Sequence, residues 1–245
     1  MRGKSHATIG LLSAIQISLL FKIPIGVFDM IVATVFSLLP DLDQPNSIVS
    51  KYIFKTEISK WIYKAFIFII NSVIFFITIK IDNNFFVSAI ATFIAIELIS
   101  GKITHGTIRK VFLTLIFVLL SLVLYMIKVP IQYVLLTLFF SIFPWFKHRS
   151  FSHSLFCVGL VYFLMSQIEM ISSIENLALY STIGYSSHIF LGDIFTKQGV
   201  PFFYPIDDKK ISIGFLKVGG KLSNFLEILF IVLLFCSVTF SLYNM

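Results

Sequence analysis

Four histidines and three aspartates of the chain occur in short polar motifs that separate long apolar stretches. They are His6, Asp41, Asp43, His148, His153, His188 and Asp193. Imidazole nitrogens and carboxylate oxygens are common ligands of Zn²⁺ and Mn²⁺. The set is larger than a single tetrahedral zinc site requires, so it can serve one or two divalent metal ions. These residue types predict a metal centre, provided that the fold brings the motifs together.

The first motif is a pair of aspartates enclosed by prolines, PDLDQP at residues 40–45. Pro40 disfavours the helical conformation of the residue before it, so we expect this segment to be extended. Residues two apart in an extended segment point the same way, and adjacent carboxylates repel each other unless a cation lies between them. We therefore expect Asp41 and Asp43 to clamp a divalent metal. The alternative is an acidic turn that ends a helix.

The second motif is HRSFSHS at residues 148–154. On one continuous helix its two histidines would point about 140° apart, so they converge only if a turn intervenes. We expect Ser150 or Ser152 to cap a helix that has His153 in its first turn. Arg149 is a candidate catalytic residue, because a guanidinium makes forked contacts with phosphate. The alternative is a polar loop at the lipid headgroup boundary.

The third motif lies at the end of an apolar stretch. It contains His188 and, five residues later, Asp193. A polar ring inside such a stretch is costly and normally marks a functional pair. Gly192 must loosen the end of the helix if both side chains are to face one ion. The alternative is that His188 is a structural histidine.

Two further residues complete the candidate site. His6 stands at the start of the first apolar stretch and is a candidate ligand, unless it is simply solvated. Glu227 stands near the start of the last apolar stretch and is a candidate general base, although it could instead extend toward the headgroups. His105 has no acidic neighbour and is predicted to lie in a loop without a metal role.

The elements that position these residues are transmembrane helices. Hydrophobic residues make up 58% of the 245 positions and charged residues only 13%, which excludes an ordinary soluble domain and a disordered chain. We predict an all-α, polytopic transmembrane protein that forms a single domain over residues 1–245. Its apolar segments, about nine in number, are expected at residues 7–21, 25–40, 65–81, 84–100, 111–127, 131–144, 154–168, 176–192 and 225–243.

The basic residues predict the orientation of the chain. All but Lys22, Lys80 and Lys128 of the 19 Lys and Arg residues fall in alternate loops on one side of the nine segments. Cytoplasmic loops carry such an excess, so we expect a multi-pass cell-membrane protein with a cytoplasmic N-terminus and all the candidate ligands at its cytoplasmic face. The net charge of +7 then suits anionic lipids, and no nucleic-acid partner is expected, because no recognition motif accompanies it.

The three motifs, in this order, resemble those of the YdjM-like inner-membrane proteins, a family described as metal-dependent hydrolases. The resemblance extends from His6 to Glu227. In the family's second motif, HRGxTHS, glycine and threonine stand where this chain has Ser150 and Ser152. The step from His188 to Asp193 is also one residue longer than the family pattern. The resemblance implies a membrane-embedded hydrolase that depends on a divalent metal.

The chemistry that we expect is hydrolysis of a phosphoester, with Zn or Mn as the most suitable metal. Membrane lipids are the expected surroundings, and a phosphorylated amphiphile such as a lipid phosphate is the expected substrate. Two alternatives remain open. An ion or solute transporter would also carry ionisable residues in its spans, and a non-catalytic membrane protein could hold a structural metal with the same ligands.

Overall fold

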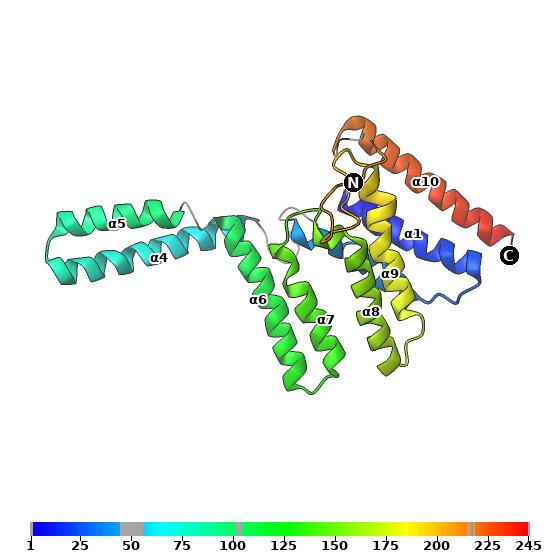
Figure 1. Ribbon diagram of the computed structural model, residues 1–245, viewed down its shortest axis with the longest axis horizontal. Coiled ribbons are helices and arrows are strands. Elements are labelled where there is room, and N and C mark those ends of the chain that lie inside the picture. The colour runs from blue at the N-terminus through cyan, green and yellow to red at the C-terminus, as the bar shows by residue number, and fades with distance from the viewer. Residues whose placement is uncertain (1, 45–55, 101–103, 215–216, 218, 245) are drawn as a thin grey trace.

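The computed structural model describes residues 2–44, 56–100, 104–214, 217 and 219–244 (Figure 1). The predicted all-α fold is confirmed, because the described residues form nine α-helices and no strand beyond one isolated bridge between Val200 and Ile211. The α-helices are α1 (Gly3–Phe21), α2 (Val27–Phe36), α4 (Thr56–Asp82), α5 (Phe85–Ser100), α6 (His105–Met126), α7 (Ile131–Ser141), α8 (Leu155–Ile171), α9 (Leu177–Ser187) and α10 (Lys221–Tyr243).

Five short helical turns connect these helices where the polar motifs occur. They are the 3₁₀ turns η1 (Leu39–Asp43), η2 (Phe143–Trp145), η3 (Phe151–His153) and η5 (Asp193–Phe195), and the π-helical turn η4 (His188–Gly192). All the aspartates and histidines of the three motifs therefore lie in or beside irregular turns at helix ends.

Three of the described helices are long and apolar enough to cross a membrane, within Glu57–Ile81, Gly106–Met126 and Lys221–Tyr243. Three shorter apolar helices lie within Phe85–Leu98, Ile131–Trp145 and Leu155–Ile171. The remaining segments are shorter or less apolar; α2, for example, has 10 residues, which span only about half of a hydrocarbon core. The expectation of about nine spans is thus not confirmed, and the orientation of the N-terminus also stays a prediction.

The helices pack in pairs whose ends converge on the site. Helix α6 packs on α7 and α8 on α9, while α1 packs against α2, α9 and α10. The α4–α5 hairpin extends away from these helices (Figure 1). The motif turns gather at one end of the α6–α9 group, close to the N-terminus of the chain (Figure 1).

Small residues allow α2 to lie unusually close to its neighbours. A Cβ atom added to Gly184 of α9 would lie 2.1 Å from the Ala33 carbonyl oxygen of α2. One added to Gly10 of α1 would lie 2.5 Å from Ser37 Cβ. Because η1 follows α2 directly, these approaches place the aspartate motif beside His6 and His188.

A buried aromatic core packs against the turns. Phe140 and Phe143 are buried, and their rings lie 5.0 Å apart between centroids. They pack in one cluster with Phe36, Leu42 and Ile189, which come from the segments that carry the aspartates and His188. The turns therefore rest on a packed apolar layer, which restricts the positions that their side chains can take.

Candidate metal centre

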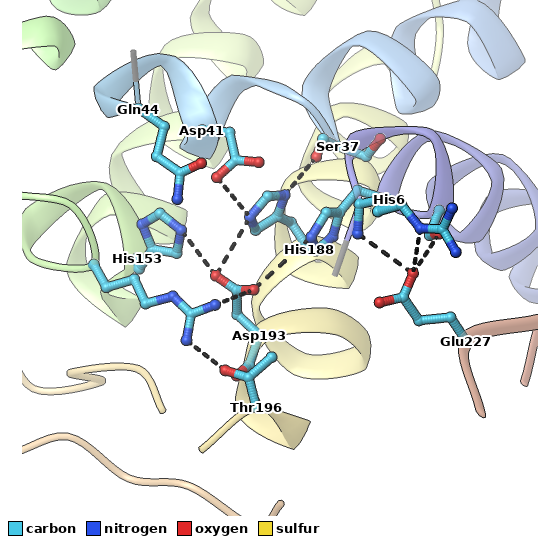
Figure 2. Close-up of polar contacts among 12 residues, drawn as sticks. His6, Ser37, Asp41, Gln44, His153, His188, Asp193, Thr196 and Glu227 are labelled. Atoms are coloured by element: carbon cyan, nitrogen blue, oxygen red, sulfur yellow. Dashed lines mark hydrogen bonds and ion pairs between the residues drawn. The ribbon is translucent and has the colours of Figure 1, made fainter. Parts of the chain in front are cut away.

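The structure brings all the candidate ligands of the three motifs and His6 into one cluster. Figure 2 shows five of them, His6, Asp41, His153, His188 and Asp193. Two groups within it have ligand atoms that all lie within 4.8 Å of one another. The buried group consists of His6, His188 and Asp193, and the outer group of Asp41, His148 and His153. Each group combines two imidazoles with one carboxylate, a donor set that suits a divalent transition metal.

The buried group is closed to solvent and tightly stacked. His6, His188 and Asp193 are each at most 2% exposed. The rings of His6 and His188 are stacked, with 3.7 Å between their centroids. Nε2 of His6 lies 3.8 Å from Oδ1 of Asp193, and Nε2 of His188 lies 3.7 Å from Oδ2. These separations exceed hydrogen-bond length but suit groups that surround a common ion.

His188 provides the strongest indication of a cation. Its Nδ1 lies 2.7 Å from the carbonyl oxygen of Ser37, an acceptor that requires the ring to donate (Figure 2). In the neutral ring this leaves the lone pair of Nε2 facing the carboxylates of Asp41 and Asp193, each 3.7 Å away, and Nε2 has no hydrogen-bond partner in the described part of the chain. Three acceptors that face one another are stabilised by a cation between them, and a metal ligand is normally held in this way through its other nitrogen.

A π-helical turn explains how His188 and Asp193 reach the same place. The backbone N–H of Asp193 donates to the carbonyl of His188, five residues earlier. Five residues on an α-helix would point the two side chains about 140° apart, whereas a π turn accommodates an extra residue and brings them toward one face. The expected loosening near Gly192 therefore takes the form of a π turn.

Gly192 also makes room for His6. A Cβ atom added at this position would lie 2.4 Å from Cε1 of His6. We expect Gly192→Ala to displace the His6 ring and to weaken metal binding by at least about tenfold, the scale of losing a supporting contact at a metal site. Metal titration of the purified variants measures this effect.

The matched control is Gly159→Ala in α8, where an added Cβ would meet no atom within 4 Å. This variant should bind metal as the unmodified chain does. Equal metal affinity of the two alanine variants would contradict a role for Gly192 in placing His6.

The outer group is partly accessible. The side chain of His148 is 25% exposed and that of Asp41 is 13% exposed, whereas His153 is buried. Nε2 of His153 lies 3.2 Å from Oδ2 of Asp193, so His153 links the two groups. Asp41 and His148 are therefore the members of this group with side chains exposed to solvent.

The prediction that Asp41 and Asp43 point the same way is wrong. Residues 39–43 form a 3₁₀ turn with Pro40 at its start, in which residues two apart point about 120° away from each other. Asp41 faces His188 at 3.7 Å, whereas Asp43 turns toward His148, with 2.8 Å between Oδ1 and Nδ1. Proline is well tolerated at the start of such a turn, which the expectation of an extended segment did not consider.

Asp43 occupies the position of an orienting carboxylate. Its Oδ2 accepts a hydrogen bond of 2.6 Å from Ser152 Oγ and lies 3.5 Å from Nδ1 of His153. Asp43 thus faces Nδ1 of both His148 and His153. A carboxylate at the second nitrogen of a ligating imidazole fixes the ring orientation and the tautomer.

The predicted cap of α8 is also wrong. Ser154 is the residue that caps this helix, and its Oγ accepts a hydrogen bond from the backbone N–H of Cys157. His153 lies before the helix, in the 3₁₀ turn η3. Ser152 instead donates to Asp43, and the Ser150 hydroxyl donates to the carbonyl of Lys147. The motif offered several hydroxyls, and only the fold decides which of them caps.

Arg149 is buried beside Asp193. Its Nη2 donates to Oδ1 of Asp193 at 2.7 Å, and its Nη1 donates to the Thr196 hydroxyl and to the carbonyl of Gly199. The residue has a left-handed backbone with φ 56°. Because the guanidinium is 3% exposed, Arg149 fixes Asp193 in place in this structure.

Glu227 lies at the edge of the cluster, where α10 meets the start of α1 (Figure 2). Its Oε2 accepts hydrogen bonds from Ser5 Oγ at 2.8 Å and from the backbone N–H of Arg2 at 3.4 Å. Ser223 Oγ donates to Oε1 at 3.4 Å. Glu227 therefore ties α10 to the residues that immediately precede His6.

The surroundings of the cluster lower the pKa of two groups, Asp193 and Lys210. Burial alone would raise the pKa of Asp193, but the imidazoles of His153 and His188 beside it outweigh this effect and hold the pKa well below its ordinary value. Partial desolvation, together with the positive charges of Arg149 and Lys147, lowers the pKa of Lys210. Asp193 is thus present as the carboxylate that a cation requires.

Sequence reasoning missed several supporting residues. Ser37 acts through its backbone carbonyl, which leaves no signature in the sequence. Thr196 holds Arg149, and the Gln44 amide is hydrogen bonded to Nε2 of His148. Gln44 lies within the PDLDQP motif and Thr196 three residues after Asp193, and this proximity to the candidate ligands is the signal that could have identified them. His105 is the first residue of α6, not part of a loop, and its side chain lies outside the described residues.

The fold and the cluster define a helical membrane protein with a histidine- and aspartate-rich centre at one end of its helices. The chain belongs to the YdjM inner membrane protein family, whose family model matches residues 1–245 and so covers its whole length. No curated protein and no solved structure matches the chain.

Proposed function

We propose that this protein is a membrane-embedded, metal-dependent hydrolase that acts on a phosphoester. The observation that supports this proposal is the pairing of a buried ligand group with an outer group that solvent can reach. A purely structural site is normally closed, whereas a catalytic site keeps a position for water or substrate. The exposed edges of His148 and Asp41 supply such a position.

The donor set favours Zn or Mn, bound as one or two ions. His6, His188 and Asp193 would hold an ion in the buried group. Asp41, His153 and His148 would hold one in the outer group, where Nε2 of His148 would exchange its hydrogen bond with the Gln44 amide for the ion. A bound divalent ion would activate a water molecule and neutralise charge on a phosphoester. Because both groups contain imidazoles, Mg as the sole metal is disfavoured.

The residues around the groups keep the ligands in place. Asp43 orients His148 and His153, the Ser37 carbonyl orients His188, and Arg149 positions Asp193. Preorganisation of this kind is required when a site must stabilise a charged transition state.

Basic side chains at the outer side would attract an anionic substrate. Lys147 and Lys210 are exposed, and Lys210 interacts electrostatically with Lys147, Arg149 and Asp43. A cluster of positive charge raises the local concentration of phosphate-bearing molecules. A lipid phosphate would reach such a site from the membrane surface, with its phosphate at the level of the headgroups.

A transporter is the competing proposal. It predicts ionisable residues near the middle of the spans, along a path through the membrane. The cluster instead uses the first turn of α1 and the short turns η1, η3, η4 and η5, all at helix ends. This placement favours chemistry at one membrane face over passage through the bundle.

Reconstituted protein incubated with a panel of phospholipids and isoprenoid phosphates tests the proposal. We expect phosphate-ester cleavage that a chelator abolishes and that added Zn²⁺ or Mn²⁺ restores. Asp43→Asn should lower turnover by about 10- to 100-fold, because both imidazoles lose their orienting carboxylate.

Asp29→Asn is the matched control, because the Asp29 carboxylate accepts a hydrogen bond from Gly26 N–H at the start of α2, away from the ligands. It should leave turnover unchanged. Metal-loaded protein that cleaves nothing in the panel but moves ions across sealed vesicles would replace the hydrolase with the transporter.

A further inference from the structure

A cavity of about 410 Å³ separates α10 from the η4–η5 turns. Its wall is apolar over most of its area, with Leu226, Leu229, Phe230 and Leu233 on one side and Leu191 and Phe195 among the residues on the other. The volume lies at the lower end of the range of about 300–1,000 Å³ that is usual for ligand pockets. It suits one narrow apolar group better than several.

The surroundings of the cavity indicate the chemical class of its occupant. Helix α10 is one of the three helices suited to span the membrane, and Phe225, Ile228 and Leu229 on it are exposed. An apolar hollow beside such a surface borders on lipid chains. Among the described residues of the wall, the polar side chains are Thr196, Ser223 and Glu227. The chemistry therefore fits a hydrocarbon chain, with its polar end near these side chains.

The wall of the cavity also contacts the supports of His6 on two sides. Gly192 lines the cavity, and the His6 ring lies against it, as the 2.4 Å approach to an added Cβ shows. Glu227 lines the cavity as well and holds Ser5, the neighbour of His6, through a hydrogen bond of 2.8 Å. A change in the separation of α10 and the η4–η5 turns would therefore move His6.

We propose that the cavity binds one alkyl or isoprenyl chain of a membrane lipid, and that this chain braces α10 against the η4–η5 turns and so holds His6 in the buried ligand group. The chain site goes beyond the proposed hydrolase and does not depend on it. Only the effect on His6 rests on the proposed metal centre.

Photochemical labelling tests the chain site without requiring enzymatic activity. The full chain is reconstituted in vesicles that contain a phospholipid with a diazirine in one acyl chain, is irradiated, and is mapped by mass spectrometry. We expect adducts on Leu191 and Phe195, on the wall that faces α10. Leu226→Trp should reduce these adducts by at least about tenfold. The indole would fill space that about two methylene groups of the lipid chain occupy, and the loss of their burial weakens binding by about that factor.

Leu222→Trp is the matched control. Leu222 lies one helical turn before Leu226, is 57% exposed and does not line the cavity, so its variant should be labelled like the unmodified chain. Leu229→Trp provides a second filling variant if Leu226→Trp does not insert. Equal labelling of Leu191 and Phe195 in the unmodified chain, the control and a folded filling variant would show ordinary bilayer contact and overturn the chain site.

The bracing of His6 has a separate readout. Removing lipid from the unmodified chain in detergent should weaken Zn²⁺ binding by at least about tenfold, whereas Leu226→Trp, with its cavity filled, should respond less. Reduced labelling in the filling variants without any effect of lipid removal on Zn²⁺ affinity would overturn the bracing alone. Absence of Zn²⁺ binding under all conditions would instead remove the proposed metal centre and leave the chain site intact.

Discussion

Replacing Arg149 with methionine is expected to lower the free energy of unfolding by about 3–5 kcal/mol. The reason is that the Asp193 carboxylate, buried and 2.7 Å from the guanidinium, would remain as an uncompensated charge. Unfolding by denaturant, followed by circular dichroism in the same detergent, measures the change. The double variant Arg149→Met with Asp193→Asn should recover most of the lost stability, because it also removes the unpaired charge.

Arg2→Met is the matched control for this prediction. Arg2 lies 3.9 Å from Glu227 but is 56% exposed, and exposed ion pairs contribute about 0–1 kcal/mol. Its loss should therefore have little effect on unfolding. If Arg149→Met and Arg2→Met destabilise the chain equally, the buried pair does not hold Asp193 as described above.

Replacing His188 with alanine is expected to weaken metal binding more than any change outside the ligands. His188 is fully buried, stacks on His6 and faces Asp41 and Asp193 with Nε2. Even the loss of an orienting partner costs about 10- to 100-fold in metal affinity, so the loss of a ligand should cost at least that. Equilibrium dialysis against Zn²⁺, with helix content measured in parallel, gives the result.

His105→Ala is the control, because the sequence predicts no metal role for this histidine. It should bind Zn²⁺ as the unmodified chain does. A folded His188→Ala variant with the affinity of the control would show that His188 is a structural histidine hydrogen bonded to Ser37.

The polar motifs were the most predictable part of the site. His148, His153, His188 and Asp193 could be assigned to one place because polar residues are rare in this chain, and the membrane forces such residues together at the ends of apolar segments. The number of spans was less predictable. Composition reports apolar stretches, but it does not report whether a helix of 10 or 11 residues, such as α2 or α9, crosses the membrane.

Local geometry at the ligands could not be predicted from residue types. PDLD lies in a 3₁₀ turn whose Leu42 packs in the core, and its residue types alone do not distinguish this turn from an extended segment. Aspartates two residues apart point the same way in an extended segment but about 120° apart in a 3₁₀ turn. The π turn at 188–192 is likewise decided by the backbone. Arg149 was assigned to substrate because its charge suggests phosphate, yet in the structure its partners are Asp193, Thr196 and Gly199.

The metal content of the purified protein tests the central claim most directly. Protein prepared without chelator, then incubated with Zn²⁺ or Mn²⁺ and desalted, is analysed by elemental mass spectrometry against protein concentration. The geometry of the two ligand groups predicts one or two ions per chain, fewer in His188→Ala and an unchanged number in His105→Ala. Protein that contains no transition metal, and takes up none of either ion, would contradict the metal centre and the hydrolase built upon it.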